Sequence, residues 1–258
     1  MMKNRILFIL MFLIAFEAIA QEGNAGFDYR IKAGFLIGGM TPIPLPAEIR
    51  AIKSFNPLLN LMIGGEVAKN LNDNWLLLGG LQFETKGMET RAQVKSYNLT
   101  MVSGDEGEIS GVFTGMVRTR VKNSYLTVPL SAMWRLHQQA KWGVKAGIYG
   151  SFLLDGDFGG SAYDGYLREG DPTGERIDIT TANYEFSDDL QRWNWGLMLG
   201  AEWRPFPHLL TSFDLTWGVN SIFKKNFDVI TYKMYPIYGA LSFGYVFFNN
   251  KTKTKMMN

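Results

Sequence analysis

Residues 192–204 alternate between two kinds of position with a period of two. The apolar positions are Trp193, Trp195, Leu197, Leu199, Ala201 and Trp203. The intervening positions are charged, amide-bearing or small, apart from Met198. A period of two places the two series on opposite faces of a β-strand. Because tryptophan favours the membrane–water boundary and the centre of the series is aliphatic, the apolar face is typical of a strand that contacts lipid.

Seven further segments repeat this alternation. Their outward series begin at Tyr29, Leu59, Trp75, Leu126, Trp142, Phe213 and Ile237. Eight segments in one phase predict an all-β fold, a transmembrane up-and-down antiparallel β-barrel of eight strands. The alternative is a barrel of ten strands, in which residues 89–118 form a hairpin of their own. The lipid-facing aromatic girdle is expected to contain Trp75, Trp134, Trp142, Trp193, Trp203, Trp217, Tyr245 and Phe247.

The connections between these segments alternate between short and long. The short ones are residues 70–73, 137–140 and 205–208. The long ones are residues 40–55, 88–118, 155–190 and 222–232. Outer-membrane barrels have short periplasmic turns and long extracellular loops. The sequence therefore predicts a protein of the outer membrane, with both termini in the periplasm and the long loops outside the cell.

The N-terminus has the organisation of a cleaved secretory signal. Lys3 and Arg5 precede an apolar run, and the small residues Ala18 and Ala20 precede Gln21. The alternative, a membrane-anchoring helix, is disfavoured because the run is too short to cross roughly 30 Å of hydrocarbon. We therefore expect a signal peptide at residues 1–20, a single barrel domain at residues 21–248 and a basic periplasmic tail at residues 249–258.

Composition excludes several kinds of chemistry. The chain has no cysteine, which excludes disulfides, thiolate metal sites and a cysteine nucleophile. The formal net charge of +2 and the lack of a basic helix argue against nucleic acid as a partner. The two histidines, His137 and His208, both fall in predicted short turns, away from the outer rim where barrel enzymes need a base. No catalytic, cofactor or metal site is predicted.

The inward-facing positions carry charges of both signs. The predicted lumen charge network contains Arg30, Lys32, Glu66, Glu84, Lys86, Lys145, Arg192, Glu202, Arg204 and Asp214, with Arg135 near the periplasmic rim. An eight-stranded barrel is only wide enough for its own side chains to fill it. Because buried charges must be paired, these residues favour an ion-paired plug. The alternative is a narrow polar pore.

The predicted loops carry two further sets of residues. Residues 155–190 are strongly acidic, which is typical of solvated loop charge. Divalent cations that bridge these acids to lipopolysaccharide are the alternative. The loop aromatics are expected either to form a recognition surface or to pack locally, and they are Phe113, Phe158, Tyr163, Tyr166, Tyr184 and Phe186.

Five stretches carry a resemblance to a known family. They are Ile31-Lys-Ala-Gly-Phe35, Tyr125-Leu-Thr-Val-Pro-Leu130, Gly143-Val-Lys-Ala-Gly-Ile-Tyr149, Trp195-Gly-Leu-Met-Leu-Gly200 and Gly244-Tyr-Val-Phe247. With these, nearly all of the mature chain resembles the PorT-like outer-membrane β-barrel family of Gram-negative bacteria, whose founding member belongs to a protein-secretion apparatus. One departure is the basic tail after Phe248, since barrels of this kind usually end on an aromatic residue. The tail is expected to weaken recognition by the assembly machinery.

These observations lead to three hypotheses for function. The first is a non-enzymatic integral outer-membrane protein with a plugged lumen, which serves an envelope complex or interacts through its surface loops. The second is a small porin-like channel, and the third is a lipid-modifying barrel enzyme. The expected partners are outer-membrane lipid and lipopolysaccharide, the barrel-assembly machinery, and an envelope or secretion complex.

Overall fold

The computed structural model describes residues 27–103, 107–135, 141–227, 229 and 232–247. The predicted signal peptide, the basic tail and His137 lie outside these residues. The described chain contains ten strands and one short 3-10 helix, η1 (Ser187–Asp189). None of its helical residues forms a helix long and apolar enough to cross a membrane.

Eight strands close a ring of antiparallel hydrogen bonds. They are β1 (Phe27–Pro42), β3 (Asn60–Asn70), β4 (Trp75–Ser103), β5 (Gly107–Arg135), β6 (Trp142–Glu169), β8 (Trp193–Phe206), β9 (Leu209–Gly218) and β10 (Met234–Phe247). Each of these strands pairs with its neighbours along the chain, and β1 pairs with β10 to close the ring. The prediction of an eight-stranded up-and-down barrel is confirmed. The ten-stranded alternative is wrong, because residues 89–118 lengthen β4 and β5 and add no strand to the ring.

The outer face of the ring is an apolar band. On β8, Trp193, Leu197 and Leu199 are exposed, whereas Asn194 and Met198 are buried inside. All eight aromatic residues of the predicted girdle lie on the outside, with exposed fractions of 40–66%. Soluble proteins rarely expose a contiguous apolar surface of this extent. The band therefore has the composition expected of a surface that contacts lipid.

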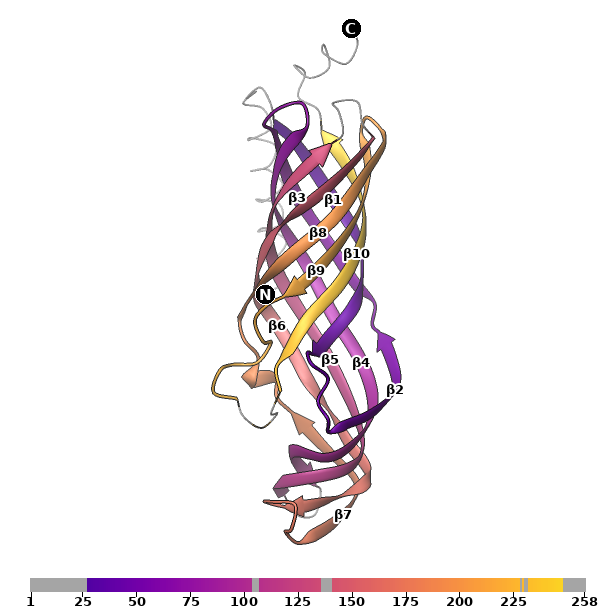
Figure 1. Ribbon diagram of the computed structural model, residues 1–258, viewed down its shortest axis with the longest axis vertical. Coiled ribbons are helices and arrows are strands. Elements are labelled where there is room, and N and C mark those ends of the chain that lie inside the picture. The colour runs from indigo at the N-terminus through magenta and orange to yellow at the C-terminus, as the bar shows by residue number, and fades with distance from the viewer. Residues whose placement is uncertain (1–26, 104–106, 136–140, 228, 230–231, 248–258) are drawn as a thin grey trace, which may run out of the picture.

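Three strands continue far beyond the ring. β4, β5 and β6 have 29, 29 and 28 residues, whereas about 9–11 residues suffice to cross a membrane. β2 (Ile49–Pro57) pairs with the outer half of β4, and β7 (Arg176–Glu185) pairs with β6 and touches β4 near the tip. Figure 1 shows this extension below the ring. The predicted loops at residues 40–55, 88–118 and 155–190 are therefore wrong, since most of their residues are strand.

The extension was hidden from the sequence pattern because its hydrophobic phase is inverted. In β4, the inward positions beyond Lys86 are apolar and buried, as at Met88, Ala92 and Val94. The outward positions there are polar, as at Gln93. Geometrically the strand keeps its alternation, but outside the membrane its outer face meets water instead of lipid. A search for apolar outward positions therefore ends at the membrane boundary.

The interior has two layers as a result. Within the ring it is mainly polar, apart from a small apolar cluster of Ala68, Leu76, Leu78 and Met133. Within the extension it is an apolar core that includes Leu99, Val121 and Leu167. Of the six predicted loop aromatics, Phe113, Phe158, Tyr184 and Phe186 are buried in this core, and the other two are half-buried. Of the two alternatives, local packing therefore holds for the four buried rings.

Candidate functional site

A cluster of ion pairs surrounds Arg30 in the lumen, near the end of the ring that carries the short turns and lies opposite the extension. The Arg30 guanidinium lies 3.3 Å from Glu66 and 2.9 Å from Glu202. Glu66 also accepts a 2.6 Å bond from Lys32. Arg30 and Glu66 are directly opposite on the paired strands β1 and β3. Glu202, on β8, is not on a strand adjacent to β1, so its bond to Arg30 crosses the barrel axis.

Arg204 extends the cluster toward the barrel end. Its nitrogens lie 3.8 Å from Glu202 and 4.0 Å from Asp28. Arg135, which was predicted near this rim, is half-buried and donates a 2.8 Å hydrogen bond to the Asn70 side chain. Asp28 is buried and was not predicted. It has the same inward phase as Arg30, so an extension of the strand by one residue would have revealed it.

A second group spans β6, β9 and the intervening β8. Lys145 lies 2.9 Å from a carboxylate oxygen of Asp214 and donates a 2.9 Å hydrogen bond to Ser212. Gly200 on β8 leaves the space for this pair, because a Cβ there would lie 2.1 Å from Asp214 and 2.9 Å from the Lys145 side chain. The lack of a side chain at Gly200 thus allows Lys145 and Asp214 to meet over β8.

A third group surrounds Lys86, on the side of the ring that leads into the extension. Lys86 pairs with Glu84 at 2.8 Å, and Thr127 donates a 2.9 Å hydrogen bond to Glu84. Three tyrosine rings surround the ammonium group at 5.3–5.8 Å from their centroids, which are favourable cation–π distances. These rings belong to Tyr125, Tyr149 and Tyr238. The sequence prediction missed them, although all three occupy inward positions of their strands.

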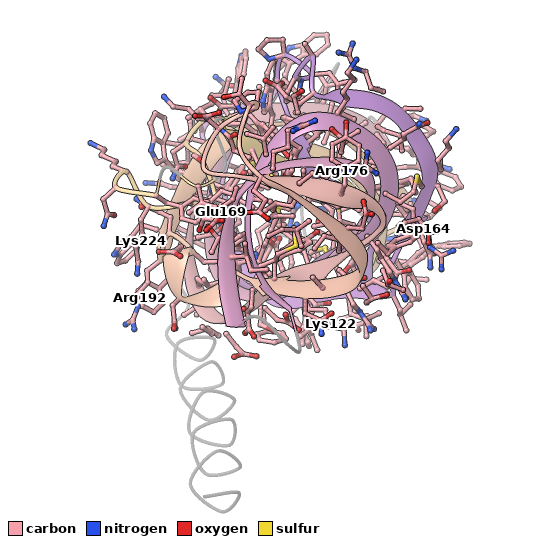
Figure 2. The ribbon with its side chains drawn as sticks, turned by 90° about the horizontal axis from the view of Figure 1, so that it is seen from below. Lys122, Asp164, Glu169, Arg176, Arg192 and Lys224 are labelled. Carbon is pink, nitrogen blue, oxygen red and sulfur yellow. The ribbon has the colours of Figure 1, made fainter. Side chains whose placement is uncertain are left out.

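One predicted member of the network is misplaced. Arg192 is exposed and precedes the first residue of β8, so its side chain is outside the lumen. Figure 2 shows it at the periphery of the molecule. The prediction was wrong because it continued the strand alternation one residue beyond the strand. The structure places Arg204 half-buried at the ring end, and it buries Arg30, Lys32, Glu66, Glu84, Lys86, Lys145, Glu202 and Asp214 inside the ring.

The charged side chains of this lumen form ion pairs with one another. Each acid named above lies beside a cation, and each buried cation has an acid within 3.3 Å. In the described part of the chain, no three histidines and carboxylates gather to hold a metal ion. His208 is at the turn-bearing end, where its ring stacks on Tyr245 and Nδ1 lies 3.0 Å from the Val246 carbonyl oxygen. Within the described residues the charges of the lumen therefore neutralise one another in pairs.

Hydrogen bonds from tyrosine hydroxyls connect the elements of the extension. Tyr97 on β4 shares a 2.7 Å hydrogen bond with Tyr232, which precedes β10. Burial raises the pKa of Tyr232 to about 12 and also raises the pKa of Tyr97. The Tyr184 hydroxyl donates a 3.0 Å hydrogen bond to the Arg118 carbonyl and shares one of 2.6 Å with Thr119. These hydroxyls stay protonated at neutral pH and hold β7 and the residue before β10 against the long strands.

Comparison with solved structures finds small bacterial barrels with low similarity. Ail, the attachment invasion locus protein of Yersinia pestis, is 12% identical with a TM-score of 0.39, and the match covers 86% of this chain and 99% of Ail. Neisserial surface protein A is 15% identical with a TM-score of 0.34, covering 87% and 98%. OprG from Pseudomonas aeruginosa is 13% identical with a TM-score of 0.33, covering 88% and 99%. At such TM-scores the likeness carries no weight for function.

The family comparison is more direct. A search of curated proteins finds no match. Residues 19–224 match the model of the outer membrane protein beta-barrel domain. That range includes β1 to β9, which are seven of the eight ring strands and both additional strands of the extension. The chain therefore belongs to the family of outer-membrane proteins built on this β-barrel domain.

Proposed function

We propose that this chain is a non-enzymatic outer-membrane barrel whose function lies on its outer surfaces. The observation that carries the proposal is the interior of the ring, which paired charged side chains occupy. Ion pairs occupy the interior of the ring, and an apolar core occupies the adjoining interior of the extension. A barrel closed in this way has its extension and its lipid-facing wall available for partners. It serves as a component of an envelope complex or as a surface-interaction protein, after export by the signal peptide at residues 1–20.

The proposed partners follow from the two surfaces. The apolar wall contacts outer-membrane lipid and lipopolysaccharide, and the barrel-assembly machinery inserts it. The extension, which reaches well beyond the ring, binds an envelope or secretion complex. The resemblance to PorT-like barrels in the five stretches from Ile31 to Phe247 favours the secretion complex within this proposal. In this orientation the short turns and both termini are periplasmic, and the extension is extracellular.

Cysteine labelling tests the orientation. The chain has no native cysteine, so each introduced thiol is unique. Thr180→Cys is on the exposed face of β7, and Asp73→Cys is in the exposed turn between β3 and β4. In intact cells we expect a membrane-impermeant maleimide to label Thr180→Cys but not Asp73→Cys. Labelling of Asp73→Cys should require permeabilisation of the outer membrane, and the reverse pattern would overturn the orientation.

Planar-bilayer recording distinguishes this proposal from the small channel. A lumen filled by paired side chains leaves no continuous column of water, because an eight-stranded ring has little interior space beyond its own side chains. We expect the refolded wild-type protein to show no stable conductance at neutral pH. Insertion is verified in the same sample by resistance of the barrel to unfolding in detergent without boiling. Long-lived, uniform channel openings would reject the plug and favour the porin-like alternative.

A further inference from the structure

The wall of the barrel has a seam between β1 and β2. Pairing of β1 with β3 ends at Leu36 and Asn60, where β3 begins. Beyond this point the chain preceding β3 is β2, which pairs with β4 and not with β1. The edge of β1 from Ile37 to Pro42 therefore has no main-chain partner on this side among the described residues. The backbone N–H of Met40 instead donates to the sulfur of Met88, at 3.3 Å.

Side chains alone close this seam. Gly39 makes the closure possible, because a Cβ there would lie 2.8 Å from the Met88 sulfur and 3.1 Å from the Phe55 ring. Phe55 covers the seam from outside and is still 49% exposed. A side chain can move from such a position by a rotamer change, whereas a paired strand edge cannot open without the loss of several hydrogen bonds.

An apolar cavity of about 310 Å³ lies directly behind the seam. Residues of β1, β2, β4, β5, β6, β7 and β10 contribute to its lining, which includes Ile49, Ala92, Val94 and Met234 and contains no charged residue. The polar groups that reach it are hydroxyls, chiefly those of Tyr97 and Tyr232. Pockets for small molecules measure roughly 300–1,000 Å³ and have this mainly apolar lining. The cavity is therefore large enough for an apolar ligand.

The mouth of the cavity is its opening at the seam, beside Phe55. β2 contributes both apolar and cationic residues to this mouth. Its inward residues Ile49, Ile52 and Phe55 are three apart, which two β-bulges make possible. The residues skipped by the bulges, Arg50 and Lys53, are exposed cations. The exposed apolar residues Ile37 and Leu59 flank the last pair of β1 and β3, so the apolar outer band reaches the start of the seam.

Two arginines near this mouth face each other. Arg91 on β4 and Arg118 on β5 are directly opposite, and both are exposed. Like charges in such cross-strand positions destabilise a sheet. Glu89 compensates in part, since it lies 2.8 Å from Arg118. Ser54 on β2 is opposite Arg91 and brings no negative charge. An anion at this place would relieve the repulsion that remains.

We propose that the cavity binds one hydrocarbon chain of an anionic amphiphile, which enters through the seam from the surrounding leaflet. The chain fills the apolar space behind Phe55. The carboxylate or phosphate headgroup stays outside, against Arg50, Lys53 and Arg91. A free fatty acid and a membrane lipid present the same chemistry, namely a linear acyl chain joined to an anion.

Binding of a fluorescent fatty acid tests this site. The full chain is refolded into nanodiscs of zwitterionic phosphatidylcholine and titrated with dansylaminoundecanoic acid. We expect saturable one-to-one binding above that of empty nanodiscs. Ala92→Trp fills the cavity and should weaken binding by about tenfold or more. Its matched control, Gln93→Trp, adds the same side chain on the outer face of β4 and should leave binding unchanged. Absence of saturable binding, or equal affinity of the two variants, would overturn the proposal.

Competition identifies the headgroup and the source of the ligand. Palmitate should displace the probe better than methyl palmitate, and the triple variant Arg50→Gln/Lys53→Gln/Arg91→Gln should remove that difference. Displacement by purified lipid A or by phosphatidylglycerol at lower concentrations than by palmitate would assign the site to a membrane lipid. Stronger displacement by palmitate would assign it to a free fatty acid. Equal displacement by palmitate and methyl palmitate would contradict the role of the cations.

Photo-crosslinking keeps the test independent of variant folding. Wild-type protein in nanodiscs is irradiated with a palmitate that carries a diazirine near its methyl end. We expect crosslinks to map to residues 49–55 and 88–94, which line the cavity. Crosslinks confined to outward residues such as Leu197 and Leu199 would mean that the fatty acid only surrounds the barrel, and the cavity site would be rejected.

Discussion

Replacement of Glu202 by alanine is expected to lower the free energy of unfolding by about 3–5 kcal/mol, the usual cost of removing one partner from a buried ion pair. Glu202 accepts bonds of 2.9 and 3.1 Å from Arg30. Arg30 is completely buried, and its Nε and Nη2 atoms have no hydrogen-bond partner in the described structure. Because a guanidinium does not release its proton, the variant would leave a buried charge whose remaining ion-pair partner in the described structure is Glu66.

Urea unfolding of the refolded protein, followed by tryptophan fluorescence, measures this loss. The matched control is Glu89→Ala, which removes a carboxylate 2.8 Å from Arg118 on the exposed face of the extension. An exposed pair contributes about 0–1 kcal/mol, so the control should unfold nearly as the wild type does. Glu202→Gln keeps an acceptor oxygen and should lie between the two. If the Glu202 and Glu89 alanine variants were equally stable, the Arg30–Glu202 pair would be hydrated, and the lumen would not be plugged.

The sequence was sufficient for the ring because lipid imposes one simple demand. Every strand that crosses the membrane must present apolar residues outward, so the eight outward series share one phase. The same phase assigned Arg30, Glu66 and Glu202 to the interior. It could not show that Arg30 pairs with Glu202 across the axis, since the register of strands far apart in the chain is a tertiary property.

The extension needed a different criterion. Its strands are amphipathic in the opposite sense, and β2 is further disguised by bulges that place Ile49, Ile52 and Phe55 on one face at a spacing of three. Neither pattern matches a search for alternating apolar outward positions. The cavity behind Phe55 was invisible for the same reason, because most of the residues that line it were assigned to loops by the sequence pattern.

Leu197→Arg is expected to reduce barrel stability by about 2–4 kcal/mol, the cost of an arginine on the lipid face near the bilayer midplane. Leu197 is 51% exposed and lies midway along the apolar face of β8, between Trp193 and Trp203. It is opposite Ile148 on one side and Trp217 on the other, so no acid is available at these positions to pair with an introduced guanidinium. The charge would have to reach water through the apolar band.

Gln93→Arg is the matched control, because it introduces the same charge on an outward position of β4 beyond that band. That face is already in water, so its effect should stay within about 0.5 kcal/mol, as for most surface substitutions. Reversible unfolding in phosphatidylcholine vesicles provides both free energies. The amount of folded, heat-modifiable protein in outer membranes should fall for Leu197→Arg alone. Equal losses in the two variants would mean that the membrane extends over the extension, and equal tolerance would mean that the outer face of β8 does not contact lipid.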